Sequence, residues 1–88
     1  MKHFEKIQSD MYQAMKSGEK ETANTLRNVL AKLKDKQIEK RTDLTQEEEI
    51  KTLQTLVKQR KESIDLYQKG GRDELVDQET KEMDIINI

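Results

Sequence analysis

The sequence predicts an all-α fold, a small bundle of about four helices, and three observations predict it. Apolar residues recur at spacings of three and four along most of the chain. No run alternates polar and apolar residues as a half-buried strand would. Proline is absent, and the three glycines stand where helices are expected to end. The expected helices cover approximately residues 2–17, 20–41, 46–69 and 72–87.

The composition is typical of helices with narrow apolar stripes and charged, solvated faces. Hydrophobic residues make up 32% of the 88 residues and charged residues 40%. Disordered chains share low hydrophobicity and high charge, but they usually carry a large net charge. Here the net charge is only −1, and the apolar residues keep a helical period. We therefore expect residues 1–88 to form a single helical domain, with a thin core at this length.

The first two expected helices are separated by Gly18, which ends the first one. The apolar face of the first helix consists of Phe4, Ile7, Met11, Ala14 and Met15. The stripe of the second helix consists of Leu26, Val29, Leu30 and Leu33. Lysines near the end of the second helix suit the partial negative charge of a helix C-terminus. Period and end signals therefore agree for both helices.

The third expected helix begins with a capping-box pattern, in which Thr45 is followed three residues later by Glu48. Its stripe consists of Ile50, Leu53, Val57, Arg60, Ile64 and Tyr67. Gly70 and Gly71 close this helix. The stripe of the fourth helix consists of Leu75, Val76, Glu79, Met83 and Ile86. The short turn favours antiparallel packing of the third and fourth helices.

Arg60 and Glu79 interrupt these stripes with charges. A lone buried charge costs several kcal/mol, so each of them must be paired or must reach water. Counted outwards from the glycine turn, the two residues lie at nearly the same height. We therefore predict a structural ion pair between Arg60 and Glu79. The alternative is that Arg60 contacts a phosphate or a partner.

The sequence contains no recognisable catalytic or metal-binding set. There is no cysteine, and His3 is the only histidine, near the N-terminus, where we expect a disordered surface residue. None of the serines has a neighbouring histidine that could activate it. An enzyme needs a base, a nucleophile or a metal held in a cleft. We therefore predict no catalytic residue, no metal site and no cofactor.

Charge is distributed unevenly between the two halves of the chain. Residues 1–44 hold ten Lys/Arg against seven Asp/Glu (+3), and residues 45–88 hold seven against eleven (−4). A basic cluster in the second helix is made of Lys32, Lys34, Lys36, Lys40 and Arg41. Its spacing suggests lysines spread around the helix on a solvated face, with weak contact to an RNA backbone as the alternative.

Neither a signal peptide nor a membrane span is expected from the sequence. The first residues contain no apolar run, and no stretch approaches the roughly 18 apolar residues of a transmembrane helix. We therefore expect a cytoplasmic protein that does not contact a membrane.

Three strings of residues resemble the YqeY family. They are Thr25-Leu26-Arg27-Asn28-Val29-Leu30, Lys58-Gln59-Arg60-Lys61-Glu62-Ser63-Ile64, and Gly71-Arg72-Asp73-Glu74-Leu75 with Glu79 downstream. The short first helix with its Met-Lys-Ser-Gly turn also fits. The resemblance spans nearly the whole chain. Since members of this family usually continue into a second small helical domain, it implies that residues 1–88 are the N-terminal part of a longer two-domain protein.

The resemblance also implies a function. YqeY proteins are similar to the tail domain of the B subunit of tRNA-dependent amidotransferases, an appendage that helps to engage tRNA while other domains carry out the chemistry. We therefore expect a non-catalytic accessory module, with tRNA, an amidotransferase or another translation component as its partner. Arg27, Lys58, Lys61 and Arg72 are the candidate contacts. A link to carbon–nitrogen ligase activity with glutamine as amido donor follows from the resemblance only.

A protein–protein interaction or self-association module is the alternative. The apolar residues of the third helix are spaced as in a coiled-coil seam, and the chain ends on an apolar run that includes Ile85, Ile86 and Ile88. An exposed apolar patch of this kind would mark an interaction surface. The sequence does not predict the oligomeric state.

Overall fold

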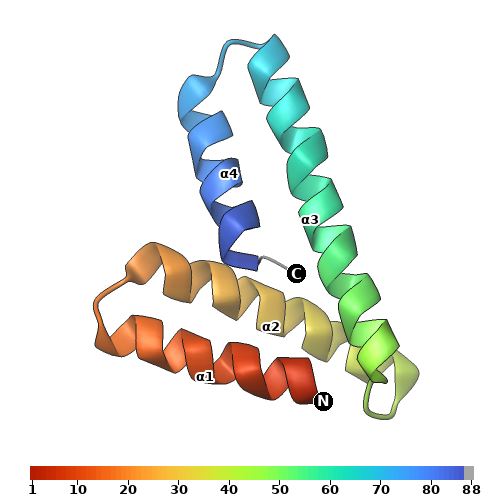
Figure 1. Cartoon of the computed structure of the whole chain (residues 1–88). Helices are drawn as coiled ribbons and strands as arrows, with labels where there is room; N and C mark the ends of the chain where they lie inside the picture. The colour runs from red at the N-terminus through yellow and green to blue at the C-terminus, as the bar shows by residue number, and fades with distance from the viewer. Residues whose placement is uncertain (87–88) are drawn as a thin grey trace.

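The structure, a computed structural model, describes residues 1–86 and is built from four α-helices (Figure 1). They are α1 (Lys2–Lys16), α2 (Lys20–Lys40), α3 (Gln46–Lys69) and α4 (Asp73–Ile86). Residues 1–86 contain no strand, so the all-α prediction is confirmed. The helix ends agree with the expected ones to within one residue, except that the expected end of the fourth helix, at residue 87, lies outside the described residues.

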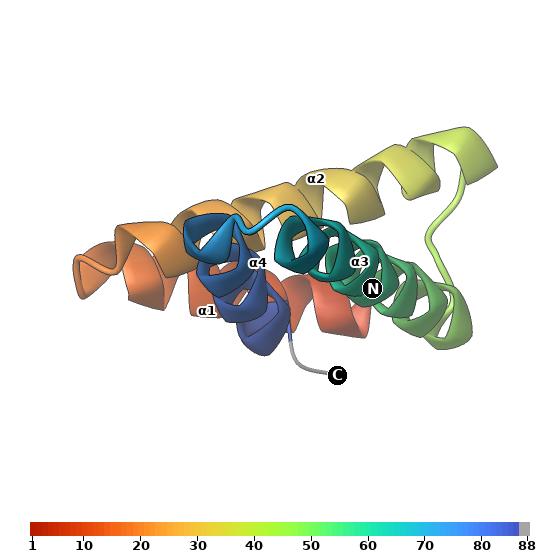
Figure 2. The ribbon, with the colours of Figure 1, turned by 90° about the horizontal axis from the view of Figure 1, so that it is seen from above.

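The helices form two antiparallel hairpins, α1 with α2 and α3 with α4, and the closest packing is within each hairpin. The second hairpin crosses the first, so that the beginning of α3 and the end of α4 rest on α1 and α2, while the α3–α4 turn projects away from them (Figures 1 and 2). The molecule measures 42 × 29 × 18 Å. The antiparallel packing of α3 and α4 was predicted from their short turn.

The core lies where the two hairpins cross. One buried cluster joins α2, α3 and α4, and consists of Val29, Leu33, Leu44, Leu53, Leu56 and Ile86. A second cluster joins α1 to α2, and consists of Met11, Leu26 and Leu30. Phe4 and Ile7 pack against both clusters. Two aspects of the predicted core are wrong: Met15 is 51% exposed, and the stripes omitted the buried Leu44 and Leu56.

Local signals set the helix ends. The capping box at the start of α3 is present: the Thr45 hydroxyl accepts a hydrogen bond from the Glu48 amide at 3.2 Å, and the Glu48 carboxylate accepts one from the Thr45 amide at 2.9 Å. Gly18 and Gly71 have φ angles of +75° and +69°, which glycine adopts without strain. Arg41, after α2, has a φ of +67° and is the one non-glycine residue with positive φ within residues 1–86.

No helix within residues 1–86 combines the length and the apolarity that a membrane crossing requires.

Candidate functional site

The four cations predicted as partner contacts are all exposed. Arg27 lies on α2, Lys58 and Lys61 lie one turn apart on α3, and Arg72 precedes α4. None of them forms an ion pair within the part of the chain that the structure describes. Three of them belong to the α3–α4 hairpin and the fourth to the other hairpin. Their charges are therefore available to an anionic partner, but no described cavity gathers all four.

Arg60 lies between α3 and α4, as predicted, but its acidic partner is different. Its Nε is 3.5 Å from Oε2 of Glu82, with side chains that are only 16% and 23% exposed. This contact is an ion pair without hydrogen-bond geometry. Its Nη1 donates a hydrogen bond to the Leu56 carbonyl at 3.2 Å. Glu79 is not within ion-pair distance, so the predicted Arg60–Glu79 pair is corrected to Arg60–Glu82.

Glu79 nevertheless belongs to the same charged cluster. Burial raises the pKa of the Glu79 carboxyl, and the neighbouring Glu82 carboxylate raises it further. The Arg60 guanidinium acts in the opposite direction and lowers this pKa. One cation therefore serves two carboxylates in this interhelical cluster. Arg60 is therefore held within the packing of α3 and α4, whereas the neighbouring Lys58 and Lys61 are exposed.

His3 is not the disordered surface residue that the sequence suggested. It lies in the first turn of α1 and is half-buried, and its Nε2 atom is buried without a hydrogen-bond partner in the described residues. Its neighbours along one small cavity include Asp10 and Asp84. Within residues 1–86, however, no group of three His, Cys, Asp or Glu side chains is arranged to hold a metal ion. The structure therefore gives His3 a packing position.

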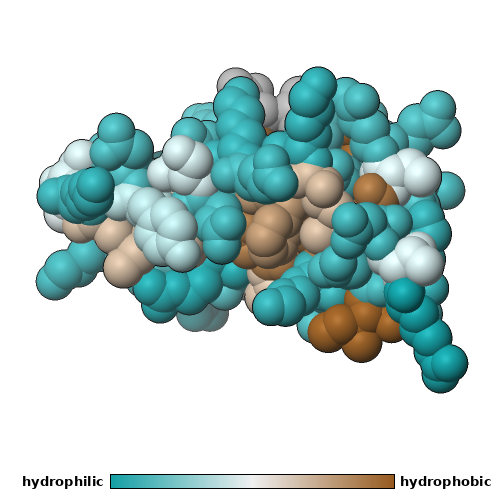
Figure 3. Space-filling model, turned by 90° about the horizontal axis from the view of Figure 1, so that it is seen from below, coloured by the Kyte–Doolittle hydropathy of each residue, from teal (hydrophilic) through white to brown (hydrophobic). Residues whose placement is uncertain are grey.

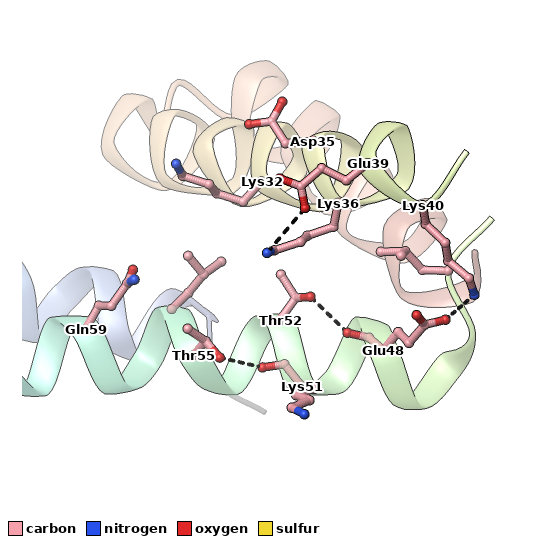
Figure 4. Close-up of a pocket in the computed structure, with 12 residues that line it drawn as sticks. Lys32, Asp35, Lys36, Glu39, Lys40, Glu48, Lys51, Thr52, Thr55 and Gln59 are labelled. Carbon is pink, nitrogen blue, oxygen red and sulfur yellow. Dashed lines mark hydrogen bonds and ion pairs between the residues drawn. The ribbon is translucent and has the colours of Figure 1, made fainter. Parts of the chain in front are cut away.

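The largest described cavity is a groove of about 770 Å³ between the second half of α2 and the first half of α3 (Figure 4). Leu44 and Leu56 form its apolar floor. Along α2 its rim carries Lys32, Lys36 and Lys40. The groove was not predicted from the sequence. We refer to it below as the α2–α3 groove.

The position of these lysines corrects part of the interpretation of the basic cluster. Lys32, Lys36 and Lys40 are spaced by four residues and share one face of α2, where Asp35 and Glu39 accompany them. Lys34 and Arg41 do not line the groove. The four-residue spacing is visible in the sequence, and it could have identified this row.

One end of the α2–α3 groove is closed by polar contacts across the loop. Lys40 bonds to the Glu48 carboxylate and also donates to the Asp43 carbonyl at 3.4 Å, while the Gln37 amide donates to Asp43 at 2.7 Å. The hydrogen bond from Lys40 and those from Thr45 lower the pKa of Glu48 from 4.5 to about 2. Lys40 is therefore occupied, unlike Lys32.

Hydrophobic side chains do not form one continuous patch on the face shown in Figure 3. Seen from below, this face is mostly hydrophilic, and its hydrophobic areas are separated by hydrophilic residues. The large exposed ones within residues 1–86 are Tyr12, Met15, Ile38 and Leu66. The α3 stripe, considered as a seam for self-association, packs inside the chain instead, with Leu53 buried. Ile86 is also buried, so it is not part of an exposed patch; Ile88 lies outside the described residues.

The fold and its surfaces define a small all-α domain of two crossed helical hairpins, with exposed cations on both hairpins and a lysine-rimmed groove between α2 and α3. The chain belongs to the YqeY-like family: the family described as "Yqey-like protein" matches residues 4–88, as the resemblance predicted.

A curated relative supports this assignment. The chain is 36% identical over 81 residues to "Altered inheritance of mitochondria protein 41, mitochondrial" from Eremothecium gossypii. The aligned region covers 91% of this chain and 44% of that protein, so the chain spans less than half the length of this relative. Neither the family description nor the name of the relative states a catalytic activity.

Proposed function

We propose that this domain is a non-catalytic accessory module that engages tRNA, or a component of the translation machinery that carries it, through exposed cations. The observation that carries the proposal is the contrast between Arg60 and its neighbours. Arg60 is fixed between helices by Glu82, whereas Lys58 and Lys61 on the same helix extend into solvent without an ion pair in the described structure. Arg27 and Arg72 are exposed in the same way.

The charge of the whole chain limits the strength of such binding. With a net charge of −1, the domain has no general attraction for nucleic acid, so binding would depend on these local cations. Contacts to phosphates dominate affinity for nucleic acids and make it fall with salt. The proposal is therefore that of a weak, salt-sensitive contact that adds to the affinity of a larger assembly. We place this activity in the cytoplasm, although the curated relative is mitochondrial by name.

Binding of bulk tRNA, measured by fluorescence anisotropy from low to physiological salt, tests the proposal. A variant with alanine at Arg27, Lys58, Lys61 and Arg72 should bind more weakly and with a shallower salt dependence, by about one unit of slope for each phosphate contact removed. The matched control replaces four different exposed cations, Lys2, Lys16, Lys20 and Lys34, with alanine. Absence of binding at low salt, or an equal loss in the control variant, would refute the proposal.

A further inference from the structure

The α2–α3 groove is a second candidate surface, separate from the four exposed cations. We propose that it binds an amphipathic helix of a partner protein, with apolar side chains on the groove floor and acidic side chains toward α2. Two helices that leave a common loop form a trough into which a third helix can pack. The α2–α3 groove has this form: α2 and α3 separate from the loop at residues 41–45, and their facing sides line it (Figures 1 and 4).

The α3 side of the groove suits an apolar occupant. Thr52 and Thr55 lie on this side, and their hydroxyls already donate hydrogen bonds within α3, to the carbonyls of Glu48 at 2.9 Å and Lys51 at 3.0 Å. With these donors occupied, the threonine methyl groups can contact an incoming side chain. Together with Leu44 and Leu56 they provide a surface for leucine-like residues.

The α2 side supplies the charge that selects the partner. Lys32 and Lys36 lie one helical turn apart, about 6 Å along the axis. Asp35 also lines the groove, although its side chain extends away from α3 (Figure 4). The lining holds four lysines, counting Lys51 of α3, against the three carboxylates of Asp35, Glu39 and Glu48, so its net charge is positive. Carboxylates spaced by four residues on a partner helix would match this row.

The intramolecular partner of Lys36 does not block this contact. Lys36 and Glu39 form an ion pair at 3.6 Å, with side chains that are 58% and 71% exposed. Pairs this exposed contribute little, so Lys36 can exchange Glu39 for a carboxylate of the partner. Lys40 stays bonded to Glu48 and closes the end of the groove. Selectivity for an acidic helix therefore rests on Lys32 and Lys36.

Two other occupants fit the groove less well. A nucleic acid would place sugars and phosphates over the apolar floor of Leu44 and Leu56, and the threonine donors beside this floor are already used. A second copy of this chain would need a helix that is both acidic and apolar on its exposed side. The acidic helix α4 exposes no large hydrophobic residue within residues 73–86. The charge and the floor therefore favour a helix from another protein.

The probe for this proposal is a designed, stapled helix of about 15 residues, with leucines on one face and glutamates four residues apart beside them. Amide chemical shifts of the labelled 88-residue chain locate its binding, and fluorescence anisotropy gives its affinity. Two further probes are compared with it. One is the same helix with lysines in place of glutamates, and the other is an RNA hairpin of similar size. The charge-reversal variant is Lys32→Glu/Lys36→Glu, and its matched control is Lys20→Glu/Lys34→Glu, on the same helix but outside the groove.

The acidic helix should shift the amides of Thr52 and Thr55, and the charge reversal should weaken its binding about tenfold while the control leaves it unchanged. A Thr55→Trp variant, which fills the groove from an exposed position without adding a charge, should abolish binding. The proposal is overturned if the acidic helix leaves the groove amides unshifted, or if the lysine helix or the RNA hairpin binds there as tightly. Shifts of these amides that depend only on protein concentration would identify a second copy as the occupant and overturn it as well.

Discussion

The buried carboxylate of Glu49 in α3 accepts a hydrogen bond from the backbone amide of Phe4, the third residue of α1, at 2.9 Å. Glu49 is only 1% exposed. The N-cap residue of α1, Met1, provides no side-chain hydrogen bond, so the free amides at this helix end depend on other partners. A carboxylate is also favoured by the positive end of the helix dipole. Glu49 therefore caps α1 from the other hairpin and fastens the two hairpins together.

Loss of the Glu49 carboxylate should weaken the contact between the hairpins. We expect Glu49→Ala to lower the free energy of unfolding by about 1–3 kcal/mol, because the half-buried Phe4 amide loses a charged acceptor. Glu49→Gln should lose less, since its amide oxygen can still accept the bond. Urea denaturation measures both changes, and hydrogen exchange of the Phe4 amide should become faster in the alanine variant. Glu47→Ala, at an exposed position in the same turn, should change stability by only about 0.5 kcal/mol. If the Phe4 amide of Glu49→Ala exchanged its hydrogen as slowly as in wild type, the capping role of Glu49 would be contradicted.

The Lys40–Glu48 contact should make stability depend on pH in acid. The hydrogen bonds from Lys40 and Thr45 lower the pKa of Glu48 to about 2 in the folded chain, from its ordinary value of 4.5. Because folding lowers this pKa, the folded state is favoured when Glu48 is ionised, and the contribution is complete above pH 4.5. It should be lost as the pH falls from 4.5 to about 2.

The comparison of wild type with Glu48→Gln isolates this effect. The wild-type protein should have the higher urea midpoint at pH 7, and the difference should shrink as the pH falls through this window. Because the pair is exposed, added salt should reduce the difference at pH 7. Glu47→Gln is the control and should show no such trend. A difference that stays constant down to pH 2 would assign the effect to something other than ionisation of Glu48.

Replacing Glu79 or Glu82 with glutamine should change the stability of the folded chain at pH 7 in opposite directions. Folding raises the pKa of the Glu79 carboxyl. The contribution of protonated Glu79 to stability is therefore complete below pH 4.5 and is lost as the pH rises through its pKa in the folded chain. Glu79→Gln resembles the protonated form, and we expect it to be more stable than wild type at pH 7 by a few tenths to about 1 kcal/mol. This advantage should disappear below pH 4.5.

Glu82→Gln should instead be less stable than wild type at pH 7, by about 1 kcal/mol, because Arg60 loses its ion-pair partner. Thermal or urea unfolding from pH 4 to pH 8 measures both variants. The opposite signs test the corrected partner of Arg60: if Glu79→Gln were the destabilising change at pH 7 and Glu82→Gln the neutral one, the pair first predicted from the sequence would be the real one.

Features that depend on neighbouring residues could be predicted from the sequence. The Thr45–Glu48 capping box and the glycine turns placed the helix ends to within one residue because their hydrogen bonds are local. The stripe of α2 was predicted because a three- and four-residue period directly places side chains on one face. The antiparallel α3–α4 hairpin followed from a turn too short for another arrangement.

Features that depend on distant residues were missed for physical reasons. Glu49 lies in an acidic first turn, which suggests a solvated charge, and its burial comes from α1, 45 residues away in the chain. The predicted partner of Arg60 was wrong by one helical turn. Glu79 and Glu82 lie on the same face of α4, and counting residues from the α3–α4 turn does not choose between them. The α2–α3 groove results from the crossing of two hairpins, which no local pattern encodes.

The backbone of Arg41 offers a stabilising substitution. Its φ of +67° and ψ of 12° are left-handed, a conformation that costs a residue with a Cβ atom roughly 1–2 kcal/mol. Helices commonly end on glycine in this conformation. The side chain is exposed and forms no ion pair within residues 1–86, so little is lost with it. We expect Arg41→Gly to raise the free energy of unfolding by about 0.5–1 kcal/mol, after the greater freedom of glycine in the unfolded chain is taken into account.

Two further variants separate the backbone effect from loss of the arginine side chain. Arg41→Ala removes the side chain but keeps the Cβ atom, so its stability should remain close to that of wild type. Gly71→Ala makes the reverse change at a nearly identical φ of +69°, where an added Cβ would meet no atom within 4 Å. It should therefore lose about 1 kcal/mol from backbone strain alone. Urea denaturation of the three variants provides the comparison; an Arg41→Gly variant no more stable than Arg41→Ala would mean that the left-handed residue after α2 carries no strain that glycine can relieve.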